Sequence, residues 1–304
     1  MAMSWSVPLG SILGIPLRLH LSFLLLLVVQ TLAQIPGGKW WVVVWLLAMG
    51  PILLATVLIH ELGHCLAARQ VGGKASGILL WPLGGLAFIH HNASPKADMW
   101  VAFAGPLTHV PMIGFWLLMS LASTYVAYGR AFVTLSFPYP EPPYFGVTLT
   151  SLALYMNIFI FAFNLLIPAY PLDGGRIFVD SLLACGVVPT AAAKITLGVA
   201  VPIAAAILVF GAVFFQPVTI MIALFLFWAC WELFDCLRKG LIAQHPLFSF
   251  TASQNAAAAA VAGQSLEVGG AGPYGAAPPR PRGAAYAPGG GAAAAPPQGR
   301  APIF

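Results

Sequence analysis

Long apolar segments separated by short polar ones constrain the fold of this chain more than any other feature. Sixty per cent of its 304 residues are hydrophobic and only 7% are charged, whereas about a quarter of the residues in a soluble domain are charged. Such a chain cannot cover a water-facing surface, so it is predicted to be an integral membrane protein surrounded by the lipid bilayer. The basic residues are spread thinly, and we expect no nucleic-acid partner.

Six stretches are apolar enough to cross, or nearly cross, a bilayer core of about 30 Å. They are residues 21–33, 40–68, 99–125, 147–167, 195–215 and 218–237. We therefore predict an all-α, multi-pass membrane protein with about six transmembrane helices. The first residues lack a short apolar segment followed by a small-residue cleavage site, so no cleaved signal peptide is expected.

The apolar stretch at residues 78–89 is too short to span a bilayer, and Pro82 and Gly84-Gly85 interrupt it. Irregular backbone is tolerated at membrane depth only where protein or a water-filled cavity covers it. We therefore expect a re-entrant loop or hairpin after the second span, beside the end of that span.

Composition divides the chain into three parts. Residues 1–20 contain Pro8, Gly10, Gly14 and Pro16, and they are interpreted as an interfacial N-terminal segment. Residues 21–248 form the predicted membrane-embedded domain, with a core at about 41–185. Residues 249–304 are rich in Ala, Gly and Pro, and such a segment is expected to form a disordered cytoplasmic tail because it cannot bury a core.

The basic residues predict the orientation. Six spans place both termini on one side, and Lys and Arg favour the cytoplasmic side of membrane proteins. Eight basic residues outside the tail fall on the side of the termini and two on the opposite side. The eight are Arg18, Arg69, Lys74, Lys96, Arg176, Lys194, Arg238 and Lys239, and the two are Lys39 and Arg130. Both termini and the end of the second span near residue 60 are therefore expected to be cytoplasmic.

That end of the second span contains the H-E-x-x-H pattern, from His60 through Glu61 to His64. Two histidines four residues apart share one face of a helix and can bind one Zn²⁺, and the glutamate beside the first is placed to act as a general base. Ionisable residues inside membrane segments are costly and are candidates for function. The pattern predicts a zinc site at the cytoplasmic end of a membrane helix.

A catalytic zinc site usually has three protein ligands, and the third is often a carboxylate. Asp173 is the favoured candidate, because it follows the fourth span at the same predicted depth as the histidines and precedes Gly174-Gly175. The other carboxylates near that side have simpler interpretations. These are Asp98 as a first-turn helix residue, Asp180 as a partner of Arg176, and Glu232 and Asp235 as ion-pair partners of Arg238 and Lys239.

Three motifs together resemble those of the site-2 protease family, the intramembrane zinc metalloproteases of peptidase family M50. They are His60-Glu61-Leu62-Gly63-His64, then Pro82-Leu83-Gly84-Gly85 with Ala104-Gly105-Pro106-Leu107, and finally Asn164 through Pro168 to Asp173-Gly174-Gly175. The resemblance covers roughly residues 5–190. It implies a three-helix catalytic core formed by the second to fourth spans, with His60, His64 and Asp173 as ligands of one Zn²⁺ per chain and Glu61 as the base.

Two positions depart from the family pattern. The family has an asparagine eight residues before the aspartate, where it resembles an oxyanion stabiliser, but Asn164 lies nine residues before Asp173. Asn164 is the predicted catalytic asparagine, and Asn157 is the alternative. After Ala104-Gly105-Pro106-Leu107 the family often has an asparagine where this chain has His109. A hydrogen-bonded core histidine is a simpler interpretation of His109 than an additional metal ligand.

The motifs predict an intramembrane zinc metalloendopeptidase that hydrolyses a peptide bond in or near the transmembrane helix of a single-span membrane-protein substrate. This is regulated intramembrane proteolysis, and the sequence identifies neither the substrate nor any regulatory membrane partner. One alternative is a catalytically inactive scaffold of the same family, which the intact motif disfavours. Another is a zinc transporter, which would need ionisable residues spread through the spans.

Overall fold

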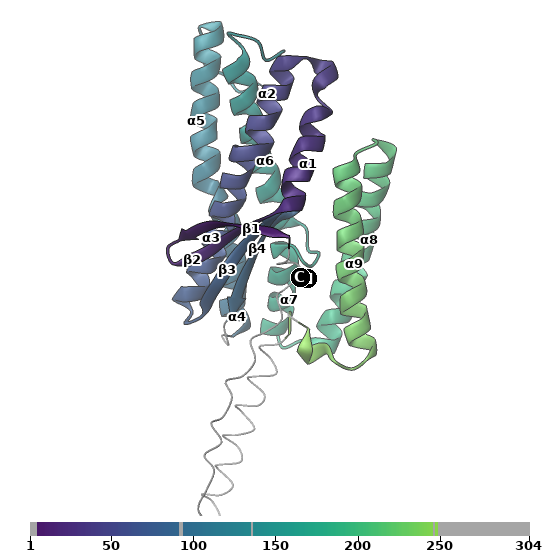
Figure 1. Cartoon of the computed structure of the whole chain (residues 1–304). Helices are drawn as coiled ribbons and strands as arrows, with labels where there is room; N and C mark the ends of the chain where they lie inside the picture. Colours follow the sequence, from purple (N-terminus) through teal and green to yellow (C-terminus); the bar gives the residue numbers. More distant parts are fainter. Residues whose placement is uncertain (1–4, 91–93, 135, 246, 249–304) are drawn as a thin grey trace, which may run out of the picture.

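The computed structural model describes residues 5–90, 94–134, 136–245 and 247–248, so the predicted tail at residues 249–304 lies outside the described part (Figure 1). The strands are β1 (Ser6–Ile12), β2 (Ile15–His20), β3 (Lys74–Trp81) and β4 (Gly84–His90). The α-helices are α1 (Leu21–Leu32), α2 (Lys39–Leu47), α3 (Leu53–Gln70), α4 (Pro95–Leu107), α5 (His109–Tyr128), α6 (Phe145–Leu166), α7 (Asp173–Ala184), α8 (Pro189–Val213) and α9 (Pro217–Arg238). Three short helical turns are η1 (Ile35–Gly37), the π-helical η2 (Ala48–Ile52) and η3 (Ile242–Gln244).

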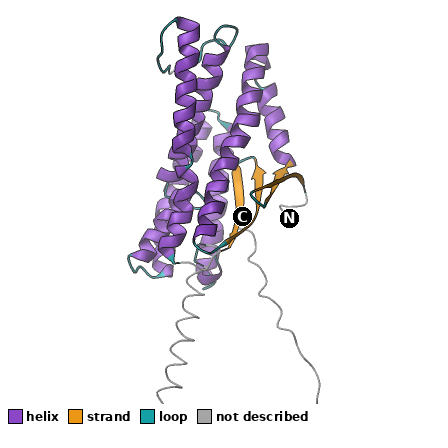
Figure 2. Cartoon of the chain, turned by 90° about the vertical axis from the view of Figure 1, so that its left-hand side faces the viewer, coloured by secondary structure: helices purple, strands orange, loops and turns teal. Residues whose placement is uncertain are grey.

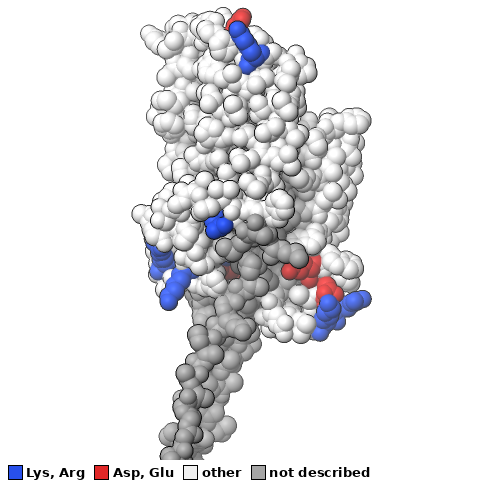
Figure 3. Space-filling view, in the orientation of Figure 1, with Lys and Arg blue, Asp and Glu red and all other residues white. Residues whose placement is uncertain are grey.

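Five helical segments are long and apolar enough to cross a membrane, as expected for a multi-pass integral membrane protein. They are Lys39–Gln70, Pro95–Tyr128, Phe145–Leu166, Pro189–Val213 and Pro217–Arg238. The predicted first span is a shorter apolar helical segment, Leu21–Gly37, so the count of six spans stays a prediction. On the face shown in Figure 3, charged side chains occur at the upper tip and over the lower half, with an uncharged band between them.

The first of these segments is one continuous helix in spite of a proline in its middle. Pro51 lacks the N–H that a regular helix needs and would clash with the preceding turn. The π-helical turn η2, which contains Pro51, joins α2 to α3. Such π-turns commonly accommodate a disruption without ending the helix, so α2 and α3 form one continuous helical segment.

The all-α prediction is wrong in one respect, because the chain also forms a four-stranded sheet in the order β1-β2-β3-β4 (Figure 2). The N-terminal segment, predicted only as interfacial, supplies β1 and β2. In β2, Ile15, Leu17 and Leu19 alternate with more exposed residues and join the core under α3. Residues 17–19 of β2 pair in parallel with residues 78–80 of β3, which joins the two antiparallel pairs into one sheet. No local sequence pattern predicts this contact, because the two segments are distant in the chain.

The stretch predicted as a re-entrant loop or hairpin forms the antiparallel pair β3–β4, which Pro82 and Leu83 connect. Its β3 residues Ile78, Leu79 and Leu80 are almost completely buried, which explains why an apolar run of this length need not span the bilayer. The hairpin contacts α3. Its depth in the membrane, and therefore its re-entrant character, stays a prediction.

Helix α7 connects the two parts of the helical assembly. On one side it packs against α4, which packs in turn against α3. On the other side it contacts α8, which pairs with α9 (Figure 1). The segment after α9 folds back, so that Phe248 and Leu247 join a buried cluster with Tyr170 just before α7. The start of α7 is thereby held between α3, α4 and the α8–α9 pair.

Candidate active site

Helix α3 places both histidines and the glutamate of the H-E-x-x-H motif in the protein interior. His60, Glu61 and His64 are all less than 10% exposed. The spacing of four residues puts the two rings on one face, with their Nε2 atoms 3.1 Å apart. The motif therefore forms the paired arrangement that its spacing predicts.

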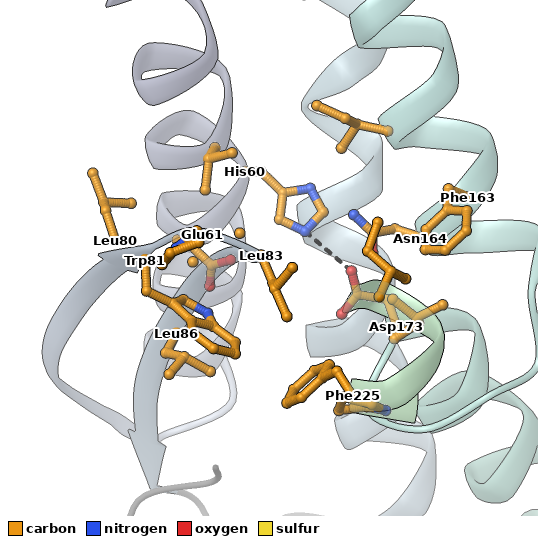
Figure 4. Close-up of a pocket in the computed structure, with 18 of the residues that line it drawn as sticks. His60, Glu61, Leu80, Trp81, Leu83, Leu86, Phe163, Asn164, Asp173 and Phe225 are labelled. Atoms are coloured by element: carbon orange, nitrogen blue, oxygen red, sulfur yellow. Dashed lines mark hydrogen bonds and ion pairs between the residues drawn. The ribbon is translucent and has the colours of Figure 1, made fainter. Parts of the chain in front are cut away.

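Asp173 is the first residue of α7, and it meets the two histidines across the protein. Its Oδ2 lies 3.1 Å from His60 Nε2 (Figure 4), and its Oδ1 lies 3.2 Å from His64 Nε2. Both oxygens of the carboxylate therefore face the two histidine Nε2 atoms, as in a group of metal ligands.

Closely approaching backbone positions this aspartate. A Cβ on Gly174 would lie 2.6 Å from the carbonyl oxygens of Leu165 and Ile167, and a Cβ on Gly175 would lie 2.3 Å from the Tyr170 nitrogen. Only glycine fits at these two positions without displacing the turn between α6 and α7. Gly174-Gly175 therefore lets the first turn of α7 pack directly onto that turn, with Asp173 facing α3.

His60, His64 and Asp173, the ligand triangle, fit a single metal ion. They form the one group of three such side chains found among the described residues, with ligand atoms all within 4.8 Å of one another. Tetrahedral ligands of Zn²⁺ lie about 2.0–2.2 Å from the ion and hence roughly 3.3–3.6 Å from each other. The distances of 3.1–3.2 Å between the nearest ligand atoms are close to that requirement.

The hydrogen bonds of His64 also indicate that a metal ion belongs in the ligand triangle. Its Nδ1 lies 2.7 Å from the Val101 carbonyl oxygen, and a carbonyl can only accept, so Nδ1 carries the hydrogen. In the neutral ring the lone pair is then on Nε2, and it points at Asp173 and at His60 Nε2. Facing lone pairs repel, and a cation between them removes the repulsion.

Two further glycines make room for this arrangement. A Cβ on Gly105 of α4 would lie 2.2 Å from His64 Nε2 and 2.9 Å from His60 Nε2. A Cβ on Gly63 would lie 2.6 Å from the Ala104 carbonyl oxygen. Helices α3 and α4 therefore approach closely because both carry glycine at the contact, and the histidine rings lie against bare backbone.

Glu61 lies beside the ligand triangle and lines a cavity of about 380 Å³. The Ala87 backbone of β4 hydrogen-bonds its carboxyl group, and a Cβ on Gly85 would lie 2.3 Å from Glu61 Cγ. Figure 4 shows Glu61 on α3 and Asp173 on α7 approaching this region from different elements. The β4 strand therefore both makes space for Glu61 and orients it.

The two candidate asparagines occupy different places. Asn164 lines the cavity, together with His60 and Asp173 (Figure 4). Asn157 is fully buried, is absent from the cavity lining, and hydrogen-bonds His109. Asn164 can therefore contact a group inside the cavity. Its role as an oxyanion stabiliser stays a prediction.

His109 is a hydrogen-bonded core histidine in the structure. It is fully buried, and its Nε2 lies 3.1 Å from His60 Nδ1, on the opposite side of the His60 ring from the ligand triangle. No local pattern predicts this contact, because 49 residues separate the two histidines.

The predicted pairing of Arg176 with Asp180 is wrong in its main contact. Arg176 Nη2 lies 2.9 Å from Asp98 Oδ1, while Asp180 hydrogen-bonds Asp98. These three buried or half-buried residues, the Arg176 cluster, tie α7 to α4. Asp235 pairs with Lys239 and Arg238 as predicted. Glu232 was also predicted to form an ion pair, but it lines the cavity. The sequence does not indicate this position, because Glu232 is distant in the chain from the H-E-x-x-H motif.

The chain is similar in sequence to known zinc metalloproteases. The sequence model of peptidase family M50 matches residues 49–139. A zinc metalloprotease of Methanocaldococcus jannaschii is 33% identical over 227 residues, which are 74% of this chain and 59% of that protein. Stage IV sporulation protein FB of Bacillus subtilis is 32% identical over 130 residues, 41% of this chain and 37% of that protein.

The chain therefore spans less than two thirds of the length of either relative. Among solved structures, the site-2 protease from Methanocaldococcus jannaschii superimposes with a TM-score of 0.49 at 28% identity, covering 75% of this chain and 94% of that one. The family match includes both histidines and Glu61, and the longer alignment covers most of the chain. This chain belongs to peptidase family M50, the site-2 protease family.

Proposed function

We propose that this protein is an intramembrane zinc metalloendopeptidase that hydrolyses a peptide bond in or near the transmembrane helix of a membrane-protein substrate. The observation that carries the proposal is the ligand triangle, with Glu61 beside it, buried next to a cavity between apolar helices. Family membership and the relative named as a zinc metalloprotease support the same reaction.

His60, His64 and Asp173 would hold one Zn²⁺. Two imidazoles and one carboxylate form a donor set typical of catalytic zinc, which leaves a fourth position open. Bound zinc acts as a Lewis acid that polarises a carbonyl group and lowers the pKa of water from 15.7 to about 7. The Gly105 contact with both rings leaves no side chain that could take the open position from the α4 side.

Glu61 and Asn164 would carry the remaining chemistry. Glu61 accepts a proton from the attacking water and returns it to the leaving amine, and such proton transfer typically contributes about 10²–10⁴-fold. Asn164 lines the same cavity, and its amide would donate a hydrogen bond to the oxyanion that develops at the scissile carbonyl. Both groups act on atoms of the substrate or of water, so both are proposed catalytic residues.

The β4 strand provides a place for an extended substrate. It is an edge strand of the sheet among the described residues, and its residues 84–87 line the cavity beside Glu61. A helical peptide bond is hydrogen-bonded within its own helix and must unwind before it can be attacked. An unwound segment could pair with β4 as an added strand, which would present its backbone to Glu61.

The proposed orientation places the ligand triangle at the cytoplasmic end of α3, with both termini cytoplasmic. The excess of basic residues on that side supports it, and so do the charged side chains over the lower half of the face in Figure 3. The substrate would be a single-span membrane protein that enters from the bilayer. A regulatory membrane partner would act on that entry.

Reconstitution of the full chain in proteoliposomes with candidate single-span membrane proteins tests the reaction. The Glu61→Gln variant keeps the size of the side chain but cannot act as a base. We expect it to retain one zinc per chain, measured by elemental analysis, and to lose about 10²–10⁴-fold in cleavage rate. Glu141→Gln is the matched control, because Glu141 is exposed in the segment between α5 and α6, and it should cleave at the wild-type rate.

Cleavage by Glu61→Gln at the wild-type rate would overturn the assignment of the base. A wild-type protein that binds zinc without hydrolysing any candidate would favour the inactive scaffold. Zinc flux into the vesicles without hydrolysis would favour the transporter.

A further inference from the structure

A row of buried hydrogen bonds extends behind His60, away from the cavity. His60 Nδ1 lies 3.1 Å from His109 Nε2, and His109 Nδ1 lies 3.3 Å from Asn157 Oδ1. The Asn157 amide nitrogen lies 3.0 Å from the Ala153 carbonyl oxygen and 3.4 Å from Thr56 Oγ1. His109 and Asn157 are both fully buried, and neither lines the cavity, so neither is placed to touch a substrate.

The Ala153 carbonyl fixes the direction of every hydrogen bond in this row. A carbonyl can only accept, so the Asn157 NH₂ must face it and Asn157 Oδ1 must face His109. Because Oδ1 can only accept, the hydrogen of a neutral His109 ring is on Nδ1. His109 Nε2 is then an acceptor, and it receives the Nδ1 hydrogen of His60.

This assignment leaves the His60 lone pair on Nε2, the atom that faces Asp173 and His64. With its hydrogen on Nε2 instead, His60 would lose its hydrogen bond to His109, and the hydrogen would block a metal. The row therefore selects the one His60 tautomer that can bind a metal.

We propose that His109 and Asn157 are positioning residues that hold His60 in its metal-binding tautomer and orientation. This inference rests on the proposed function, because it requires His60 to be a metal ligand. His64 receives the same support from the Val101 carbonyl, a backbone atom that substitution cannot remove. The support of His60 depends on two side chains and can be tested by mutation.

Partners of this kind make a ligand more basic and hold its ring in place, and their loss typically lowers metal affinity about 10–100-fold. The two polar atoms of His109 can be replaced one at a time. His109→Gln puts an amide oxygen near the place of Nε2 and keeps an acceptor for His60. His109→Asn puts its amide near the place of Nδ1, which keeps the contact with Asn157 but leaves His60 Nδ1 without its acceptor.

The experiment measures the Zn²⁺ dissociation constant of the full chain in detergent by competition with a chelator of known affinity. We expect His109→Asn and Asn157→Leu to weaken zinc binding about 10–100-fold, and His109→Gln to stay within roughly threefold of wild type. Ser120→Ala is the matched control, because Ser120 forms a buried hydroxyl pair with Ser151 between the same two helices, α5 and α6. It should bind zinc like the wild type.

Thermal unfolding of the zinc-free proteins separates positioning from folding. Equal zinc affinity in His109→Asn, His109→Gln and wild type would overturn the inference and leave the proposed zinc site intact. Equal loss in the Asn and Gln variants, in parallel with lower melting temperatures, would also overturn it, because the role would then be structural. A wild-type protein that binds no zinc would instead refute the proposed function itself.

Discussion

Two buried polar clusters lie along the first two turns of α7, and they differ in the charges that they contain. The ligand triangle joins Asp173 to α3, and the Arg176 cluster joins Arg176 and Asp180 to Asp98 of α4. Both are shielded from solvent, and both hold two elements together. On burial and hydrogen bonding alone they would be hard to tell apart.

The Arg176 cluster contains its own positive charge. Burial lowers the pKa of Arg176, but Asp98, Asp173 and Asp180 more than offset this and keep its pKa above the ordinary value. Burial and the neighbouring Asp98 raise the pKa of Asp180 to about 9, so this carboxyl group retains a proton at neutral pH. The cluster is therefore satisfied by the protein itself.

The ligand triangle has no such internal balance. In the tautomers that the hydrogen bonds of His60 and His64 require, both Nε2 atoms and the Asp173 carboxylate present lone pairs to one point. Among the described residues, no lysine or arginine forms an ion pair with these three groups. A buried group of acceptors without a donor indicates an external ion, whereas a balanced group indicates a structural role, although both perturb pKa values.

The largest difference should follow from removing Asp173. Asp173→Ala leaves zinc with two protein ligands, so we expect a loss of zinc affinity greater than the roughly 10–100-fold typical of residues behind a ligand, together with loss of cleavage. The zinc-free variant should unfold at or above the wild-type temperature, because the substitution removes a buried carboxylate whose oxygens face the lone pairs of His60 and His64. Chelator competition and thermal unfolding measure the two effects. A strongly destabilised zinc-free variant would contradict the comparison.

Removing Arg176 should have the opposite profile. Arg176→Met leaves Asp98 without its guanidinium partner, and breaking such a buried pair typically costs about 3–5 kcal/mol of unfolding free energy. Unfolding in detergent would measure this cost. Lys239→Met is the control, because it breaks the solvent-exposed pair with Asp235, and exposed pairs contribute about 0–1 kcal/mol. Equal effects of the two substitutions would show that the Arg176 cluster is not structural.

The smallest effect should come from Asp180, and it should depend on pH. The folded pKa of about 9 lies above the unfolded value of roughly 3.9, so the folded state binds more protons and its stability falls as pH rises between these values. Asp180→Asn has no proton to lose and keeps a donor for Asp98. Its melting temperature relative to wild type should therefore rise steadily from pH 5 to pH 8. A difference in melting temperature between the two proteins that does not change with pH would refute the raised pKa of Asp180.

Local patterns predicted the parts of the fold that depend on local chemistry. Apolar runs predicted the membrane helices, because a segment of about 20 apolar residues has few other stable environments. Local patterns did not predict the sheet. Its strands of six to eight residues are too short for their pattern to distinguish a strand from a loop. Pairing between residues 17–19 and 78–80 depends on contacts that no local window contains.

The candidate site also has some features that local patterns predicted and others that depend on long-range contacts. His60 and His64 are one helical turn apart, so their pairing followed from spacing. Asp173 was predicted from its depth and its glycines together with the resemblance to the family motif. The partner of Arg176 was predicted within its own helix, but the guanidinium reaches Asp98 on α4, where the close packing of α4 against α7 brings the two together. The contact between His60 and His109 was not predicted, because it depends on how α5 packs behind α3.

The sequence by itself determined that the chain lies in a membrane and that α3 carries the residues of a zinc site, because apolar length and helical spacing are local properties. The tertiary structure alone decided which groups orient those residues. It placed the Val101 carbonyl behind His64, the His109–Asn157 pair behind His60, and β4 against Glu61. Each of these contacts joins segments that are distant in sequence. The Val101 contact needs the close packing of α3 against α4 that Gly63 and Gly105 permit, and the β4 contact needs the strand approach that Gly85 permits.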